Sequence, residues 1–181
     1  MRAEWKMQRL VVSLFALSIL AIAQSSQVAK PSEAAAADVA SPEAILKATY
    51  DVISGPAGVQ RDWNRLRSLC IPEVRFVVVA NPGSDKPVHS YDIDGFIASA
   101  DKALATEGFY ERGIANRIER FDRMAHVFST YESRHNANDP KPFERGINSF
   151  QLANDGKRWW IVSIFWEGEQ AEHPIPKKYL K

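Results

Sequence analysis

The fold of this chain is decided by residues 143–167, FERGINSFQLANDGKRWWIVSIFWE, which form two predicted strands around a tight turn. The four residues at 154–157, NDGK, are typical of a β-hairpin turn. The strand after the turn, 158–167, carries large apolar side chains at both alternating sets of positions. A sheet with one face in water alternates apolar and polar residues, so we expect both faces of this strand to be covered.

A second hairpin is predicted directly before the first. Residues 109–121 and 124–135 flank a two-residue turn, Asp122-Arg123, so that four strands follow one another as an antiparallel meander. An earlier strand is indicated at 74–80, VRFVVVA, which is an almost unbroken run of β-branched residues. Strands therefore dominate the C-terminal half of the chain.

Helical patterns occupy the preceding part. The motif SPE at 41–43 supplies a capping hydroxyl, a proline at the first helical position and an acid in the first turn, and GP at 55–56 ends that helix. A short second helix ends before Pro72, and a third begins near Asp92. Helices gathered early and strands gathered late predict an α+β fold with helices on one face of an antiparallel sheet.

The N-terminal residues indicate export. Three basic residues precede an apolar run of ~14 residues, which is shorter than the about 20 that a membrane-spanning helix needs. Ala21-Ile22-Ala23 fits the small-residue rule for a cleavage site. We therefore expect a signal peptide at 1–23, a flexible linker at 24–40, one domain at 41–170 and a C-terminal tail at 171–181. The mature protein is then periplasmic or secreted, and an uncleaved anchor is the alternative.

Composition limits the partners. The chain has 181 residues, 45% of them apolar and 25% charged, which suits one globular domain and a targeting segment. A net charge of +1 without a basic stripe gives no reason to expect nucleic acid as a partner. With one cysteine and four scattered histidines, no disulfide within the chain can form, and no metal or other cofactor is expected. No membrane contact is expected after signal cleavage.

The order of these elements resembles the NTF2-like superfamily, also called SnoaL-like or ketosteroid-isomerase-like, over residues 42–170. The motifs that carry the resemblance are DWNRL at 62–66, HVFSTYE at 126–132, RGINS at 145–149 and DGKRWWIV at 155–162. The likeness is greatest to small exported bacterial members of unknown activity. It implies a curved antiparallel sheet packed on three helices as a cone, a pocket at the open end, and a homodimer through the sheet. The superfamily includes isomerases, dehydratases, cyclases and assembly domains, so the fold does not choose the function.

His126 is the candidate catalytic base. The two-residue turn places it opposite Glu119, and Glu132, the second catalytic candidate, follows on the same face. A histidine beside a carboxylate can abstract a proton next to a carbonyl group. The alternative is a structural histidine within the hydrogen bonds of the sheet.

Six residues are candidates for binding a ligand. Arg145 lies one strand away from Glu132, and the pair is either an anchor for an anionic or carbonyl ligand or an ordinary cross-strand salt bridge. The inferred hairpin register also places Arg145 opposite Trp166, and Asn148 on the same side as Ser163. The candidates are Tyr50, Trp63, Phe76, Arg145, Asn148 and Trp166.

Three functions follow from these patterns. The leading one is an exported domain that binds a small, partly apolar ligand. The second is a metal-free lyase or isomerase with His126 as general base. The third is a structural or interaction dimer whose cavity is filled by Trp63, Phe76 and Trp166. The cavity distinguishes them, because the first needs it open, the second needs His126 in it and the third needs it filled.

Overall fold

The structure is a computed structural model that describes residues 33–80 and 82–181. The predicted signal peptide lies outside the described residues. The helical elements are η1 (Ala36–Val39), α1 (Pro42–Ile53), α2 (Trp63–Leu69), α3 (Ile93–Leu104) and η2 (Lys177–Tyr179). The strands are β1 (Cys70–Val79), β2 (Val88–Tyr91), β3 (Tyr110–Phe121), β4 (Met124–Arg134), β5 (Glu144–Asn154) and β6 (Trp159–Gly168). None of the helices in the described part is long and apolar enough to cross a membrane.

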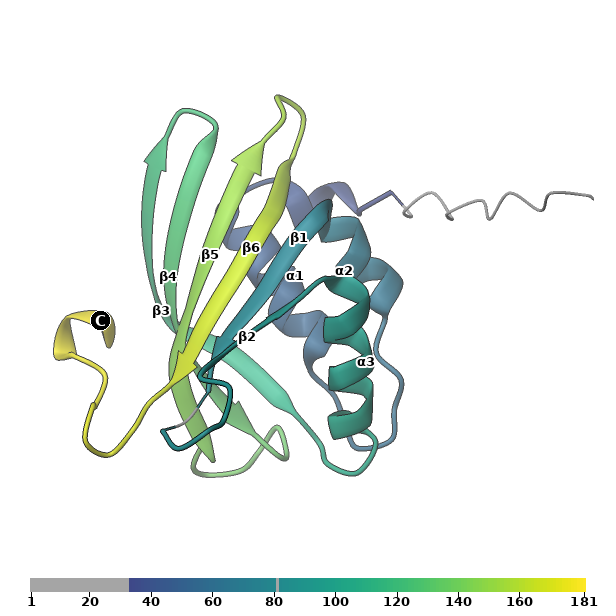
Figure 1. Ribbon diagram of the computed structural model, residues 1–181. Coiled ribbons are helices and arrows are strands. Elements are labelled where there is room, and N and C mark those ends of the chain that lie inside the picture. Colours follow the sequence, from purple (N-terminus) through teal and green to yellow (C-terminus); the bar gives the residue numbers. More distant parts are fainter. Residues whose placement is uncertain (1–32, 81) are drawn as a thin grey trace, which may run out of the picture. The chain divides into compact units, whose positions relative to one another are not determined.

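The six strands form one curved sheet in the order β2-β1-β6-β5-β4-β3 (Figure 1). Strands β3 to β6 are the predicted antiparallel meander, with Asp122 at a φ of 46° and Gly156 at a φ of 96° in its turns. The α+β fold class is confirmed. The sheet is mixed, however, because β1 pairs in parallel with β6 and antiparallel with the short strand β2, which the sequence analysis did not predict.

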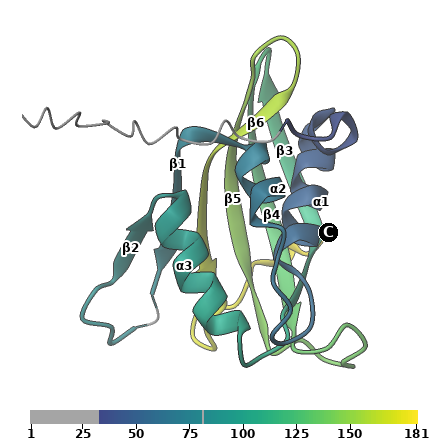
Figure 2. The ribbon, with the colours of Figure 1, turned by 90° about the vertical axis from the view of Figure 1, so that its right-hand side faces the viewer.

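The three α-helices cover one face of the sheet (Figure 2). Each begins at a side chain that caps it: Ser41 accepts a hydrogen bond from Ala44 N at 3.1 Å, and Asp62 and Asp92 cap α2 and α3 in the same way. The core lies between these helices and the sheet. Its fully buried members include Ile45, Leu46, Leu66, Val74, Phe76, Val127, Phe150 and Ile161.

A β-bulge in β6 changes which side chains face the helices. Leu152 pairs with Ile161 but Gln151 pairs with Ser163, so Val162 is an extra residue in β6. The alternation of faces shifts at that point. Trp159, Ile161, Ile164 and Trp166 consequently all pack on the helix side, and Phe165 is left 45% exposed on the outer face.

This bulge corrects two expectations. Trp166 lies opposite Asn148 and not Arg145, and Ser163 lies opposite Gln151. Strand β6 also presents fewer large apolar side chains to the outer face than its sequence indicates, because the bulge moves Ile164 and Trp166 to the same face as Trp159.

The C-terminal tail runs across the outer face of the sheet, opposite the helices (Figure 1). Ile175 is buried there and its N–H donates to Glu169 Oε1 at 2.8 Å. Further along, Thr130 Oγ1 donates to the carbonyl of Tyr179, whose ring lies 4.9 Å from the ring of Phe128. The tail therefore packs on the surface of the domain that faces away from the helices.

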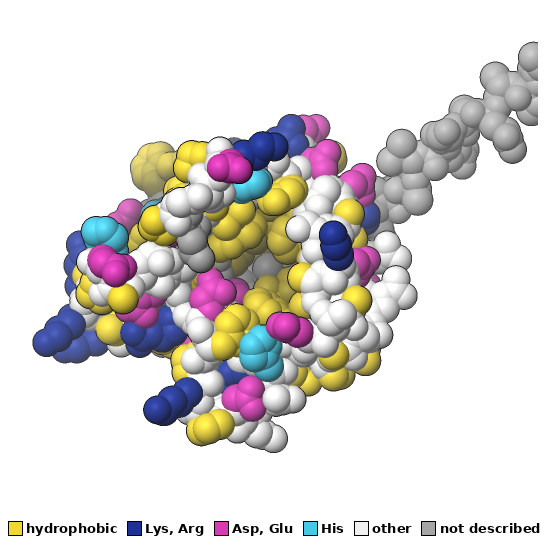
Figure 3. All heavy atoms as spheres, turned by 60° about the horizontal axis from the view of Figure 1, so that its bottom comes forward, with side chains coloured by type: hydrophobic (Ala, Val, Ile, Leu, Met, Phe, Trp, Pro, Cys, Tyr) yellow, Lys and Arg dark blue, Asp and Glu magenta, His cyan; other side chains and the backbone are white. Residues whose placement is uncertain are grey.

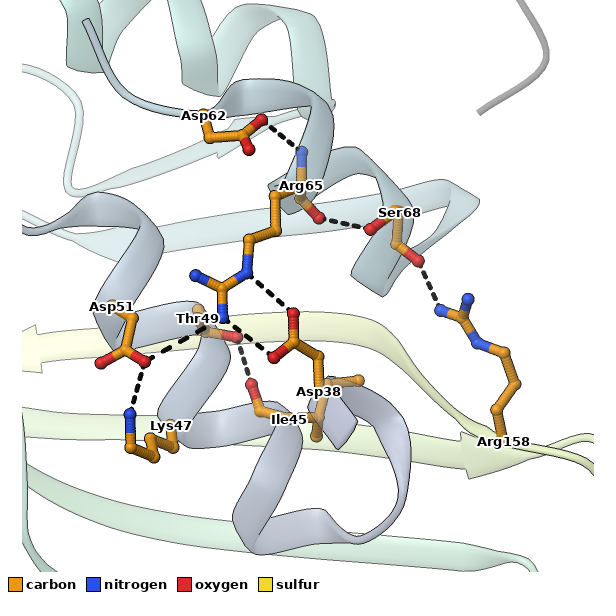
Figure 4. Close-up of polar contacts among 9 residues, drawn as sticks. All are labelled: Asp38, Ile45, Lys47, Thr49, Asp51, Asp62, Arg65, Ser68 and Arg158. Carbon is orange, nitrogen blue, oxygen red and sulfur yellow. Dashed lines mark hydrogen bonds and ion pairs between the residues drawn. The ribbon is translucent and has the colours of Figure 1, made fainter. Parts of the chain in front are cut away.

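The last residues of the predicted linker are packed against the domain. Val39 is buried in the core, and both Asp38 carboxylate oxygens accept hydrogen bonds from Arg65 of α2, at 2.7 and 2.9 Å (Figure 4). Asp62 caps the same helix through Arg65 N. The bidentate contact between Asp38 and Arg65 and the burial of Val39 show that the folded domain begins before Ser41.

Substitutions in η1 test this extension. Val39→Ala is expected to lower the free energy of unfolding by about 1–2 kcal/mol, because it removes buried methyl groups. Asp38→Asn is expected to lower it by about 1 kcal/mol, because it removes a partly buried ionic contact. Asp94→Asn is the matched control, since Asp94 pairs with Arg67 while remaining 77% exposed. Chemical denaturation measures all three, and wild-type stability in both η1 variants would show that η1 does not belong to the folded unit.

Candidate functional site

A cavity of about 260 Å³ lies between the three helices and the sheet. Figure 3 shows the end of the domain at which the surface is hollowed, with hydrophobic side chains in the hollow and acidic side chains beside it. The lining residues come from α1, α2, α3, β1 and β3 to β6 and from the segment before β3. The size is slightly below the ~300–1,000 Å³ typical of small-molecule sites.

One wall of the cavity is aromatic. Phe96 of α3 stacks on Phe76 of β1 with ring centroids 4.3 Å apart, and it meets Trp63 and Trp166 edge to face at 6.4 and 6.3 Å. Trp63 Nε1 donates to Asp101 Oδ1 at 2.6 Å, so the indole nitrogen is already satisfied and the ring serves as apolar surface.

A second part of the cavity wall is a hydrogen-bonded set of polar side chains from α1, β3, β4 and β5. Tyr50 Oη and Ser129 Oγ are 2.6 Å apart. Asn148 Nδ2 donates to Tyr50 Oη at 3.3 Å and to Glu111 Oε1 at 3.0 Å, and Ser133 Oγ donates to Glu111 Oε2 at 3.0 Å. Each of these side chains is held by at least one other, so the wall is preorganised.

Glu111 is the group in this wall with the most altered acidity. Burial raises its pKa to about 7, and the nearby Glu144 carboxylate acts in the same direction, while the hydrogen bonds from Ser133 and Asn148 oppose the rise. A carboxyl group with a pKa near 7 can both accept and give a proton at neutral pH.

Tyr131 stands next to this wall. Its hydroxyl donates to Glu144 Oε1 at 2.8 Å, and burial raises its pKa above the ordinary value, as does the Glu144 charge. The ring fits because the neighbouring strand has Gly146 there, where a Cβ would lie 2.5 Å from Tyr131 Oη. Glycine at 146 thus leaves room for a phenol at the cavity edge.

The charged side chains at the cavity are all acidic. Of the residues that line it, Glu111 and Glu144 are the carboxylates, and there is no lysine, arginine or histidine among the described ones. Within residues 33–80 and 82–181, no ion pair includes Glu111 or Glu144. In the same part of the chain, no group of three or more histidine, cysteine, aspartate or glutamate residues is arranged to hold a metal ion.

Five of the six predicted ligand-binding residues line the cavity. They are Tyr50, Trp63, Phe76, Asn148 and Trp166. The sixth, Arg145, does not line it. Its guanidinium binds Glu169 Oε2, at 2.9 Å from Nε and 2.7 Å from the other nitrogen, although its Cα lies opposite that of Glu132 as expected.

The two predicted catalytic residues lie on the other face of the sheet. His126 does sit opposite Glu119 in the register, but its Nε2 contacts Ser149 Oγ at 3.0 Å on the outer face. Glu132 is held by Arg112 Nε and by Arg134, both at 2.6 Å, and these contacts keep its pKa below the ordinary value. Neither side chain lines the cavity, so neither can contact a ligand bound there.

Four residues at the cavity were not predicted from the sequence: Phe96, Glu111, Tyr131 and Glu144. In β4, the polar residues Ser129, Tyr131 and Ser133 lie on one face and His126 lies on the other. Because both faces of the strand carry polar residues, the sequence pattern could not show which face the helices cover. The role of Glu111 depends on its neighbours across β4 and β5, which no local pattern shows.

No family model and no curated protein matches this chain. Solved structures do. An NTF2-like protein of unknown function from Silicibacter pomeroyi matches with a TM-score of 0.51 and 16% identity, over 72% of this chain and 94% of its own. A Nostoc punctiforme domain of unknown function with a cystatin-like fold gives 0.55 and 10%, over 77% and 80%. A Parabacteroides distasonis protein described as a candidate ketosteroid isomerase gives 0.50 and 10%, over 72% and 89%.

These likenesses show that the chain has the NTF2-like fold, as the sequence motifs predict. At identities of 10–16% they show the fold alone. Any function must therefore be argued from the cavity itself.

The acidity of Glu111 predicts a pH-dependent stability. Its pKa is about 7 in the folded protein and 4.5 ordinarily, so between these values the folded state holds a proton that the unfolded state releases. The free energy of unfolding should then fall as pH rises from 4.5 to 7, by up to about 3 kcal/mol from this group. At pH 5 the Tm of Glu111→Gln should lie below that of the wild type. At pH 8 this difference in Tm should be smaller or reversed. Thermal unfolding at both pH values measures this, and an unchanged difference in Tm would refute it.

Proposed function

We propose that this domain binds a small, partly apolar molecule in the cavity between its helices and its sheet. The observation that carries the proposal is that the cavity is open. Trp63, Phe76 and Trp166 form its wall and do not fill it, which leaves about 260 Å³ of space. An unfilled cavity forgoes dispersion contacts that larger side chains would supply, so a bound molecule is the natural source of the missing contacts.

The two walls define the character of the ligand. The aromatic wall of Phe76, Phe96 and Trp166 suits a flat apolar body, which would bury its surface against the rings. The polar wall around Glu111 and Asn148 suits one polar group at the end of that body. This division between apolar enclosure and few oriented polar groups is typical of small-molecule sites.

The alternative with His126 as general base has no support from this geometry, because the imidazole lies on the outer face. The alternative of a filled cavity is also not favoured, since the aromatic side chains leave space between them.

Uptake of a neutral fluorophore tests the binding function. N-phenyl-1-naphthylamine is weakly fluorescent in water and bright in apolar surroundings, so the protein should enhance its emission to saturation at one molecule per chain. Ala100→Phe places a ring into the cavity from α3 and should abolish the enhancement. Ala98→Phe is the matched control, because Ala98 is exposed on the same helix, and it should bind like the wild type.

Equal enhancement by the Ala100→Phe and Ala98→Phe variants would place the fluorophore outside the cavity and refute the proposal. Circular dichroism of both variants establishes that they are folded. Mass spectrometry of small molecules that remain with the purified protein would then identify natural ligands.

Export to the periplasm or the medium is a second proposal, which rests on the residues at 1–23 described above. Self-association through the outer face of the sheet is a third. It is supported by Phe165, a large apolar side chain that is 45% exposed on the outer face of β6.

The dimer proposal has a direct test. Light scattering at micromolar concentration should give the mass of two chains for the wild type and of one chain for Phe165→Glu. Val59→Glu is the control, since Val59 lies between α1 and α2 and is 54% exposed. A wild type that scatters as a monomer would exclude this dimer.

A further inference from the structure

The carboxyl group of Glu111 lies at the cavity without a positive partner. Its two oxygens accept hydrogen bonds from the neutral groups of Asn148 and Ser133, and no ion pair of the described residues reaches it. The nearest arginine in sequence, Arg112, points to the other face of the sheet and binds Glu132. Glu111 is therefore a partly buried acid, and none of the described residues supplies a positive charge to balance its negative charge.

Such an arrangement costs stability. A carboxylate loses hydration when it is buried, and hydrogen bonds from neutral donors replace only part of it. The Glu144 carboxylate at the same cavity adds repulsion and has a neutral partner, Tyr131. Proteins commonly pair buried acids with lysine or arginine. The missing cation at this position is therefore a feature that a ligand can complete.

The rest of the cavity suits the apolar body of such a ligand. Aromatic rings present large flat apolar surfaces on which a bound molecule can pack. Trp63, Phe96 and Trp166 surround the same space that Glu111 lines. The aromatic wall can thus receive the apolar body of a ligand whose charged end reaches the acid.

We propose that the ligand of this cavity is an aromatic or aliphatic amine whose protonated nitrogen binds the Glu111 carboxylate while its apolar body packs on Phe76, Phe96 and Trp166. The inference rests on the binding function proposed above and adds the charge of the ligand. Carboxylates and phosphates are disfavoured, because the described lining has two acids and no base to receive them.

The proposal has a pH signature. Ionised Glu111 binds an ammonium group and protonated Glu111 does not, and burial gives this group a pKa of about 7. Affinity for an amine should thus rise as pH increases from 5.5 to 7.5, while an alkylamine stays protonated. Around Glu111, Tyr50 of α1 and Tyr131 of β4 have raised pKa values and stay neutral in this range, and Glu144 of β5 adds negative charge. The other charged groups near Glu111 are Asp51, Arg112, Arg134 and Asp139, which line a neighbouring surface depression together with it.

Three probes with one apolar body test the proposal by isothermal titration calorimetry on the full chain. They are 2-(1-naphthyl)ethylamine, 2-(1-naphthyl)ethanol and 1-naphthylacetate. At pH 7.5 the amine should bind about tenfold more tightly than the alcohol, as for a charge-assisted hydrogen bond, and the acetate more weakly than the alcohol. The affinity of the amine should fall about tenfold at pH 5.5, and that of the alcohol should stay within about twofold.

Glu111→Gln separates charge from shape. Glutamine keeps one acceptor oxygen for Asn148, and the Ser133 hydroxyl can turn to accept from the new amide, so the wall is retained. The variant should bind the amine only as tightly as it binds the alcohol, and without pH dependence. Glu119→Gln, which makes the same change on the outer face, should alter none of these affinities.

The outcomes distinguish the two proposals. If the protein takes up N-phenyl-1-naphthylamine but binds the naphthyl amine no better than the alcohol, or binds none of the three probes, the charge preference is wrong and the binding function stands. If N-phenyl-1-naphthylamine also fails to enter the cavity, the binding function itself is wrong.

Discussion

The insertion of one residue, Val162, into β6 is the constraint on which the site depends. Strand side chains alternate between faces, so without the bulge Phe165 would face the helices and Ile164 and Trp166 would face outwards. With it, Trp166 lies next to Phe96 and forms the aromatic wall. The same shift places Asn148 opposite Trp166 in the sheet, which brings the polar and aromatic walls together at one cavity.

The polar wall keeps an acid partly buried at the cavity, at a cost in stability. Asn148 bridges Tyr50 and Glu111, so one side chain holds a helix residue and an acid on β3 in fixed positions. An apolar residue in place of Glu111 would avoid the desolvation of a carboxyl group. Retaining the acid in a partly buried position makes chemical sense when a partner outside the folded chain offsets its cost.

Local features were predictable from the sequence and long-range features were not. Ser41 as a cap, the hairpin turn at 154–157 and the pairing of Glu119 with His126 each depend on residues close in the chain. The parallel pairing of β1 with β6 joins segments about ninety residues apart, and the bulge changes register without a glycine to mark it. His126 was therefore placed on the correct strand with no means of knowing that the helices cover the opposite face.

The course of the C-terminal tail decides how this protein can be handled. Its last turn, η2, is fixed to β4 through Thr130 and Phe128 on the face away from the helices. An affinity tag or a tether to a solid support joined after Lys181 therefore leaves from the side of the sheet opposite the cavity. Small molecules keep free access to the hollow in such an immobilised protein, whereas a bulky fusion partner would obstruct the outer face of the sheet.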